Sequence, residues 1–509
     1  MSRSLFFRVA ALAIIAAGAF TFTGCLGTNS FFANRAFPPS TVLQRVLVAI
    51  QNPSIVQTGA LQIVDARYDI RNSENGSVPL FFIGGYSGSL PSYIQNYPEE
   101  SAGYVYGSGD GSFTAINYGK ENVSGHISGL PSRSSSIFIT QDGKYTFAAA
   151  QNAQYLTVVD EVAPAVVNLN LPNVYKVAVN PSGSVALAFV QNSNYAYRVI
   201  HLQQPDGTVM APPTYPTESS WPKAVSPVDC QPVNLPLYCV VPVLDQNSNP
   251  IAFDRPYNTI FSSDGTTGWL LNCGPECGGQ QSSVSFLSIG ALDVYNFPGS
   301  TYPAPSLQPS PTAPTELRRV PVPGGATMAL YGPAPTYVAG TPSPTGKPIL
   351  YISGQQVQSD GLLEGFLSVL DLTTNQVTAK YPISDGTHTK MLFGDDNTLW
   401  IGSQVCQSGY RTANNLVNGC LTFFNLSNNA VLVEPWYGDL TGLCAIIEWH
   451  KMYTAYGGQL HIYATTNTGI TTFQSGPYTA GSELSNIDVT VHGTAYDVAY
   501  MDAPSNAAD

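Results

Sequence analysis

The side chains that could perform catalysis or bind a metal ion are few and widely spaced in this sequence. Its six histidines form no His-x-x-x-His pair, and no Gly-x-Ser-x-Gly nucleophile motif occurs, so no catalytic residue can be named. The best cluster contains Asp385, His388 and Lys390, and His450 is the next histidine along the chain. A carboxylate and two imidazoles can hold a divalent cation that polarises a carbonyl group. We therefore predict Asp385, His388 and His450 as metal ligands; the alternative is that they only cap turns and strand ends.

Eight cysteines divide into one near the N-terminus, six in sequence-close pairs and one left over. Such pairing is typical of proteins from oxidising compartments. The predicted disulfides are Cys230 with Cys239, Cys273 with Cys277, and Cys406 with Cys420. The first and last pairs would each stabilise the fold by about 3 kcal/mol, whereas the tight loop of the middle pair also allows a reducible bridge or half of a soft-metal site. Cys444 lies among apolar residues and is expected to be a small buried hydrophobe, with a reactive thiol as the alternative.

The N-terminus has the features of an export signal. Arg3 and Arg8 form a short basic region, and the apolar run 9–22 that follows is too short to span a bilayer stably. Residues 22–25, Phe-Thr-Gly-Cys, resemble the bacterial lipobox. This resemblance implies a cleaved signal peptide (1–24), an acyl lipid on Cys25 and a flexible tether (25–41). Leu26, rather than an aspartate, follows the cysteine, which implies outer-membrane sorting, on the periplasmic or the cell-surface side. An ordinary signal peptide that leaves Cys25 unmodified is the alternative.

The composition excludes several classes of function. Only 10% of the residues are charged, the net charge is -13, and no run of Lys or Arg exists to neutralise phosphates. Nucleic acid is therefore not an expected partner, and neither is a membrane contacted through a basic surface. Gly, Pro and Tyr are abundant, which is typical of turn-rich sheet proteins. The only predicted membrane contact is the lipid on Cys25.

Degenerate repeats predict the fold. Residues 137–159 and 177–199 align without gaps at an offset of 40, and in each copy an apolar strand meets a tight turn and a second apolar run. The turns contain Asp142-Gly143 and Ser182-Gly183. A strand, a Gly-containing turn and another strand form a β-hairpin, and a period near 40 residues corresponds to four short strands. Similar hairpins are predicted around 261–271 and 393–401.

A second repeated element supports the same architecture. Residues 367–372 and 421–426 align as third blade strands, as do 61–65 and 156–160, while 460–463 are predicted as a second strand. We therefore expect an all-β chain forming a single β-propeller over 42–505, with seven four-stranded blades as the central estimate and six to eight allowed. The final strand, 495–501, is expected to pair with the N-terminal region and close the ring. Residues 298–324 are interpreted as a Pro-rich inserted loop, and 506–509 as a tail.

The repeats also carry a resemblance to a known family. The Asp-Gly or Ser-Gly turn, the apolar second strand and the Val158-Val159-Asp160 third strand resemble those of YVTN-type, lactonase-like propellers of bacterial envelopes. This resemblance implies a propeller over about 45–505. It also implies a protein with a binding role or, in a minority of cases, an enzyme, and the fold alone does not choose between them.

Two functions follow as hypotheses. The first is a monomeric, lipid-anchored binding or assembly module of the cell envelope, with a protein or glycan as partner. Aromatic stretches such as 93–97 and 104–106 suit either contact with such a partner or packing within strands. The second is a metal-dependent, lactonase-like hydrolase or lyase that uses a divalent cation held in the central channel by Asp385, His388 and His450.

Overall fold

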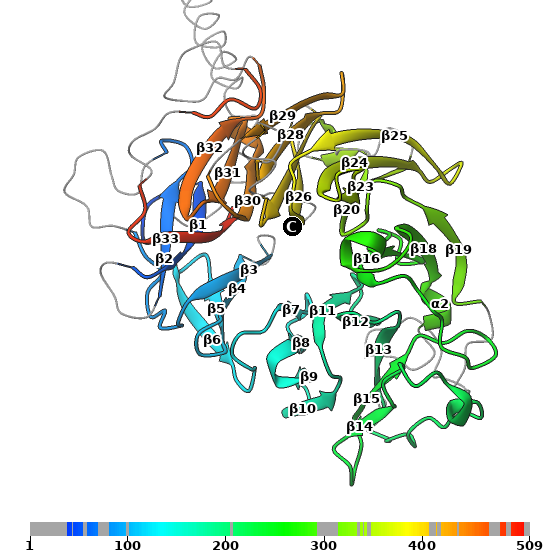
Figure 1. Cartoon of the computed structure of the whole chain (residues 1–509). Coiled ribbons are helices and arrows are strands. Elements are labelled where there is room, and N and C mark those ends of the chain that lie inside the picture. Colours follow the sequence, from blue (N-terminus) through cyan, green and yellow to red (C-terminus); the bar gives the residue numbers. More distant parts are fainter. Residues whose placement is uncertain are drawn as a thin grey trace, which may run out of the picture.

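Short antiparallel strands joined by tight turns arrange the chain as a ring of sheets around a central axis (Figure 1). The computed structural model describes residues 38–502 except 43, 54–58, 70–80, 98–100, 204–206, 293–313, 333–335, 339–340, 344–347, 396, 407–413, 415–418, 435–436, 468–478 and 485–489. The signal peptide and Cys25 lie outside the described residues. Within them, no helix has the length and apolar character needed to cross a bilayer.

The described strands form eight blades, numbered here along the chain and given from the axis outward. Blade 1 contains β33 (Thr494–Tyr500), β1 (Arg45–Gln51) and β2 (Ala60–Asp65), with a bridge from Gln62 to Phe82 beyond them. Blade 2 contains β3 (Pro91–Tyr97), β4 (Ala102–Gly107), β5 (Ser112–Asn117) and β6 (Asn122–Ile127). Blade 3 contains β7 (Ser136–Ile139), β8 (Tyr145–Ala150), β9 (Tyr155–Asp160) and β10 (Ala165–Asn170).

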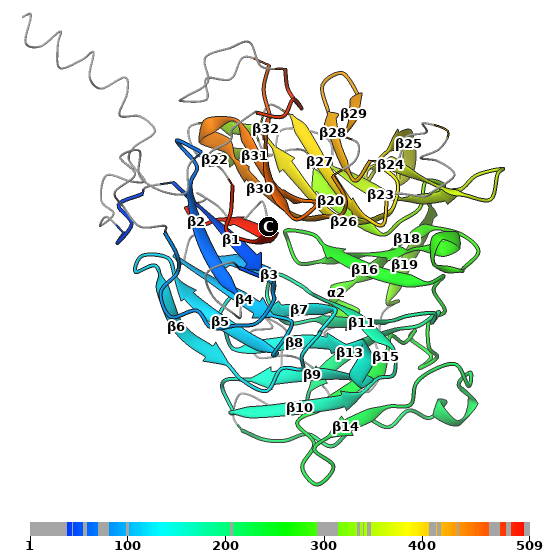
Figure 2. The same cartoon turned by 60° about the vertical axis from the view of Figure 1, so that its left-hand side comes forward.

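Blade 4 has five strands: β11 (Val174–Val179), β12 (Ala186–Val190), β13 (Ala196–His201), β15 (Tyr238–Pro242) and, at its outer edge, β14 (Asp229–Gln231) (Figure 2). Blade 5 contains β16 (Pro256–Phe261), β17 (Thr267–Asn272), β18 (Ser283–Ser288) and β19 (Glu316–Pro321). Blade 6 contains β20 (Met328–Gly332), β23 (Ile349–Val357), β24 (Leu363–Asp371) and β25 (Gln376–Ile383), and the hairpin of β21 (Thr336–Val338) and β22 (Thr341–Ser343) is inserted after β20.

Blade 7 contains β26 (Thr387–Gly394), β27 (Thr398–Gln404), β28 (Leu421–Asn425) and β29 (Ala430–Glu434). Blade 8 contains β30 (Leu440–Ile446), β31 (Lys451–Tyr456) and β32 (Gln459–Ala464), with a bridge from Tyr463 to Glu483 beyond them. The described helices are single turns: η3 (Gln151–Ala153), η4 (Glu218–Ser220), η5 (Gly274–Cys277), α2 (Ile289–Leu292) and η6 (Ile447–Trp449).

The hydrophobic core lies between neighbouring blades, because both faces of each sheet are covered. Successive side chains of a strand point to opposite faces. In β8, Phe147 and Ala149 therefore pack toward blade 4, whereas Ala148 packs toward blade 2. Burial of each aliphatic or aromatic side chain contributes roughly 1.5–3 kcal/mol. Strands such as β8 and β12 are therefore buried along their whole length rather than at alternate residues.

The two ends of the chain close the ring, as the sequence predicted. β33 pairs antiparallel with β1, and the first and last strands lie side by side in Figure 1. The guanidinium of the fully buried Arg45 donates to Asp502 through Nε (3.0 Å) and Nη2 (2.7 Å), and to Glu121 of blade 2 through Nη1 (2.9 Å). Glu121 also accepts hydrogen bonds from the backbone N–H and hydroxyl of Ser40. The closure therefore removes two exposed sheet edges and fixes the last part of the predicted tether.

The structure confirms the repeats and corrects the blade count. The aligned segments 137–159 and 177–199 are β7 to β9 and β11 to β13, and Gly143 and Gly183 adopt φ values of 69° and 70° in equivalent turns. The expected number of seven blades is wrong, since there are eight. The tyrosine-rich stretches 93–97 and 104–106, for which packing within strands was one expectation, lie in β3 and β4 of a complete blade.

Two smaller predictions also need correction. Residues 316–321, within the predicted Pro-rich loop 298–324, form β19, because an outer strand needs only one buried face and tolerates prolines at its ends. Residues 460–463 lie in the third strand of blade 8, not the second, because the Gly457-Gly458 turn follows the second strand, β31, rather than the first. The third-strand predictions for 61–65, 156–160, 367–372 and 421–426 are confirmed in β2, β9, β24 and β28.

Candidate functional site

The predicted metal ligands Asp385 and His388 lie at the start of β26, where they bond neighbouring backbone groups. Oδ1 of Asp385 accepts a hydrogen bond from the N–H of Gly365 (3.0 Å). The imidazole of His388 is fully buried, and its Nε2–H donates to the carbonyl of Ser384 (2.9 Å). Burial lowers the pKa of His388 to about 4, so the ring is neutral at physiological pH.

His450 lies at the face of the ring where the inner strands end, opposite the face that holds His388. It ends the turn η6, and its Nδ1–H donates to the carboxylate of Asp395, which also accepts from the hydroxyl of Thr465. Asp395 directly follows β26, whereas His388 is the second residue of that strand. His450 and His388 are therefore separated by the length of a strand that rises about 3.3 Å per residue.

The predicted metal site is consequently not assembled. The described part of the chain contains no group of three His, Cys, Asp or Glu side chains placed to share a metal ion. Asp385 and His388 are close in sequence and in space, but His450 binds Asp395 instead. In physical terms, residues before and after an inner strand lie on opposite faces of a propeller, and the sequence does not show on which side of its strand a histidine falls.

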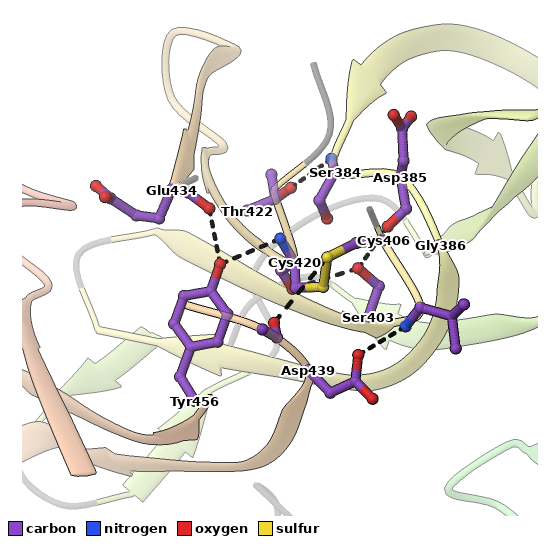
Figure 3. The surroundings of a disulfide bond; sticks show 12 residues. Ser384, Asp385, Gly386, Ser403, Cys406, Cys420, Thr422, Glu434, Asp439 and Tyr456 are labelled. Atoms are coloured by element: carbon purple, nitrogen blue, oxygen red, sulfur yellow. Dashed lines mark hydrogen bonds between the residues drawn. A yellow bond between two sulfur atoms is a disulfide. The ribbon is translucent and has the colours of Figure 1, made fainter. Parts of the chain in front are cut away.

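All three predicted disulfides are present: Cys230–Cys239, Cys273–Cys277 and Cys406–Cys420. The last one closes the connection between β27 and β28 next to Asp385, whose carbonyl accepts a hydrogen bond from the hydroxyl of Ser403 (2.6 Å; Figure 3). Cys444 is buried on β30 in the core between blades 8 and 1, as a small hydrophobe would be.

The Cys273–Cys277 loop connects three blades. Glu276, in this loop, accepts hydrogen bonds from the backbone N–H (2.7 Å) and the amide Nε2–H (3.0 Å) of Gln355. Oε1 of Gln355 accepts from the N–H of Gly386, just before β26. Burial raises the pKa of Glu276 to about 7. These contacts link blades 5, 6 and 7, which favours a structural role for this disulfide.

A cavity of about 870 Å³ occupies the centre of the ring. Residues from all eight innermost strands line it, and the glutamines Gln151, Gln191 and Gln404 lie at the face where the inner strands begin. Its size lies within the range of small-molecule sites, which combine apolar walls with a few placed polar groups. The central channel is therefore the best candidate for a functional site among the described residues.

A repeated backbone irregularity shapes this channel. Near the start of six of the eight described inner strands, the register against the next strand shifts so that one extra residue is left unpaired. A β-bulge of this kind bends the strand and redirects a side chain. The extra residues all line the cavity: Ser92, Tyr175, Tyr257, Thr389, Thr441 and Tyr496. The bulges thus place three tyrosines and three hydroxyl side chains in the channel wall.

The residues that follow the bulges bring charge into the channel. The charged residues among the described cavity lining are Lys176, Lys390 and Asp497. Nζ of Lys390 lies 3.1 Å from Oδ1 of Asp497, and this pair spans blades 7 and 1. Gly442, the equivalent residue of blade 8 between them, leaves the space that the pair needs, because a Cβ there would lie 2.8 Å from Oδ1 of Asp497.

Lys176 is on the opposite side of the ring. Its Nζ lies 4.8 Å from the ring centroid of Tyr257, which itself packs against Tyr175 at 5.4 Å between centroids. Burial lowers the pKa of Lys176 to about 8, although the side chain keeps partial exposure toward the channel. The aromatic face therefore stabilises an ammonium in a poorly hydrated position.

Sequence reasoning found only part of this site. Lys390 belongs to the cluster around His388, but Lys176, Tyr257 and Asp497 were missed. A usable signal existed, since a Tyr or Thr precedes the channel-facing polar residue in Tyr175-Lys176, Tyr257-Asn258, Thr389-Lys390 and Tyr496-Asp497. The signal is weak because Tyr and Thr are common in all strands.

Comparisons with known proteins agree with the fold. No family model and no curated protein matches the sequence. A dihydro-heme d1 dehydrogenase, NirN, solved in complex with DHE, aligns over 92% of this chain and 79% of its own at 11% identity, with a TM-score of 0.50.

Lactonase-type propellers are also among the structural neighbours. The periplasmic gluconolactonase PpgL of Pseudomonas aeruginosa aligns over 90% of this chain and 98% of its own, at 13% identity and a TM-score of 0.39. A putative 6-phosphogluconolactonase from Bacteroides uniformis aligns over 90% and 99%, at 11% identity and a TM-score of 0.39. The likeness to NirN, with its TM-score of 0.50, shows a shared fold and no more, and the likenesses to the two lactonases carry no conclusion about this chain.

Proposed function

We propose that this chain is a lipid-anchored binding module of the bacterial cell envelope that takes a glycan into its central channel. The observation that carries the proposal is the set of bulged inner strands, which direct Tyr175, Tyr257 and Tyr496 into a cavity of about 870 Å³. A bulge interrupts the ladder of hydrogen bonds, and bulges are over-represented next to binding and active sites. Its recurrence at one tier of the ring suits a ligand site.

The chemistry of the lining suits a sugar ring. Aromatic faces provide large apolar contact surfaces at low entropic cost, and hydroxyl and amide side chains can pair with sugar hydroxyls. Besides the tyrosines, the lining contains the amide of Asn258 and, at the mouth, the bonded amides of Gln151 and Gln191. The channel therefore offers flat apolar walls together with neutral donors and acceptors.

The proposed location is the outer membrane, through an acyl lipid on Cys25. Its support is the lipobox-like sequence at 22–25 together with Leu26 after the cysteine. Three disulfides are consistent with an oxidising compartment. No specific observation favours the metal-dependent lactonase-like alternative, because Asp385 and His388 do not converge with His450.

Titration calorimetry with the full mature protein in detergent would test the proposal. The ligand panel would contain neutral and acidic oligosaccharides of bacterial and plant walls. We expect at least one to bind, and Tyr257→Ala to weaken its binding by roughly three- to tenfold, as expected for a lost aromatic contact. Tyr331→Ala is the matched control, since Tyr331 is 36% exposed, stacks on Trp269 and is not part of the cavity lining.

Two outcomes would contradict the channel as the binding site. One is that no saccharide in the panel binds. The other is that a saccharide binds and Tyr257→Ala leaves its affinity unchanged, while circular dichroism shows that the variant is folded. Unchanged binding would move the site to the outer loops.

A further inference from the structure

The charges of the channel are distributed unequally around the ring. On one side, Lys390 is neutralised by Asp497 at 3.1 Å, and Oδ2 of Asp497 also accepts the N–H of Ile94 (2.8 Å). On the other side, the partner of the Lys176 ammonium is the ring of Tyr257. No described carboxylate lies within ion-pair distance of Lys176. The described lining therefore has a net charge of about one positive unit, in a protein whose net charge is -13.

The absence of a counterion at Lys176 has a cost. A poorly hydrated ammonium is destabilised relative to water unless it is paired, and an aromatic face compensates only in part. The lowered pKa of Lys176, about 8, reports this incomplete compensation. A structural lysine at this position would gain from a neighbouring acid, as Lys390 does. The arrangement instead leaves the compensating charge to come from outside the chain.

We propose that the channel ligand is an acidic saccharide, one carboxylate of which pairs with Lys176 beside Tyr175 and Tyr257. This inference rests on the glycan-binding function proposed above and specifies its substrate class. The ammonium supplies the charged contact, and the tyrosines contact the ring that carries the carboxylate. The Lys390–Asp497 pair is already neutral and offers no second anion site, so a ligand unit with a single charge fits best.

A matched pair of probes would separate this inference from the underlying function. Tri-galacturonate and its fully methyl-esterified form share a ring system and differ in charge; trimannuronate and its methyl ester form a second pair. Calorimetry with the full mature protein is expected to show that an acid form binds at least tenfold more tightly than its ester, as expected for a hydrogen bond to a charged group.

Substitutions at Lys176 would assign the effect. Lys176→Gln is expected to remove the preference for the acid form, and Lys176→Arg to retain it. Lys120→Gln is the control, since Lys120 is exposed at the surface and outside the cavity lining. Because only the protonated amine pairs with a carboxylate, affinity for the acid form should fall by about tenfold between pH 7 and pH 9. The ester should show no such change.

Competitive acylation of lysines followed by mass spectrometry gives a readout independent of calorimetry. An acidic saccharide should protect Lys176 from acylation and leave the labelling of the exposed Lys120 unchanged. The inference would be overturned if esters bind as well as acids with Tyr257→Ala still weakening both, an outcome that leaves the glycan-binding function intact. If neither form of any probe binds, the inference is overturned, and the neutral saccharides of the first panel still test the glycan-binding function. If an acidic saccharide binds without protecting Lys176, the inference is overturned and the glycan-binding function stands.

Discussion

Replacing Asp502 by asparagine should loosen the closure of the ring by about 3 kcal/mol. The carboxylate of Asp502 is fully buried and accepts three hydrogen bonds from Arg45: from its backbone N–H (2.9 Å), Nε (3.0 Å) and Nη2 (2.7 Å). Breaking a buried ion pair usually costs about 3–5 kcal/mol. The lower end applies here because Glu121 remains 2.9 Å from Nη1 of Arg45 and still compensates part of the charge.

Hydrogen exchange measured by mass spectrometry reports this closure locally. Since about 1.4 kcal/mol corresponds to a factor of ten in an equilibrium constant, the amides of β33 in Asp502→Asn should exchange about a hundredfold faster than in the wild type. Lys144→Gln is the control: it breaks an ion pair whose side chains are 52% and 44% exposed, and such pairs contribute about 1 kcal/mol or less. Equal exchange of β33 in Asp502→Asn and Lys144→Gln would refute the reasoning.

Three further predictions concern pH and the N-terminus. Burial lowers the pKa of His388 to about 4, so between pH 4 and 6.5 the folded state binds fewer protons than the unfolded state. The free energy of unfolding should therefore fall by up to about 3 kcal/mol as pH drops from 6.5 to 4. In urea titrations His388→Gln should lack this part of the pH dependence. Burial raises the pKa of Glu276 to about 7, so the folded state binds more protons than the unfolded state between pH 4.5 and 7. The free energy of unfolding should therefore fall by about 1–3 kcal/mol as pH rises through this range, given the partial exposure of Glu276. Glu276→Gln should flatten the plot of unfolding free energy against pH in that range, and an unchanged plot would show that Glu276 titrates normally. Cys25→Ser should abolish incorporation of radiolabelled palmitate and release the protein from the outer-membrane fraction, whereas labelling that persists in Cys25→Ser would exclude Cys25 as the lipid attachment site.

The repeats made the fold predictable because most blades contain the same local hairpin. A strand, a turn with a glycine at positive φ, and an apolar second strand leave a signature within about 25 residues, as at Gly143 and Gly183. Blade 2 escaped recognition because its first turn is not of that kind: Tyr97 and Ala102 are joined by a connection that lacks a glycine. The count of blades therefore depended on the least typical repeat.

The site was less predictable because it arises from contacts between distant segments. Lys390 and Asp497 are 107 residues apart, and they meet because the ring closes and because Gly442 leaves room between them. Asp395 and His450 are 55 residues apart and pair at the face opposite His388. Sequence proximity grouped Asp385 with His388 correctly, but no local pattern shows which inner-strand residues share a tier.

The closing strand links stability and the proposed site. β33 supplies the innermost strand of blade 1, and the same seven residues carry Tyr496 and Asp497 into the channel. Without Asp497, Lys390 would become a second ammonium without a carboxylate partner, and both sides of the channel would carry a positive charge. The position of β33 therefore determines both that the ring is closed and that, among the described lining residues, Lys176 is the ammonium left to pair with an anion. This coupling implies that a weakened closure, as in Asp502→Asn, should also reduce the charge selectivity of the channel.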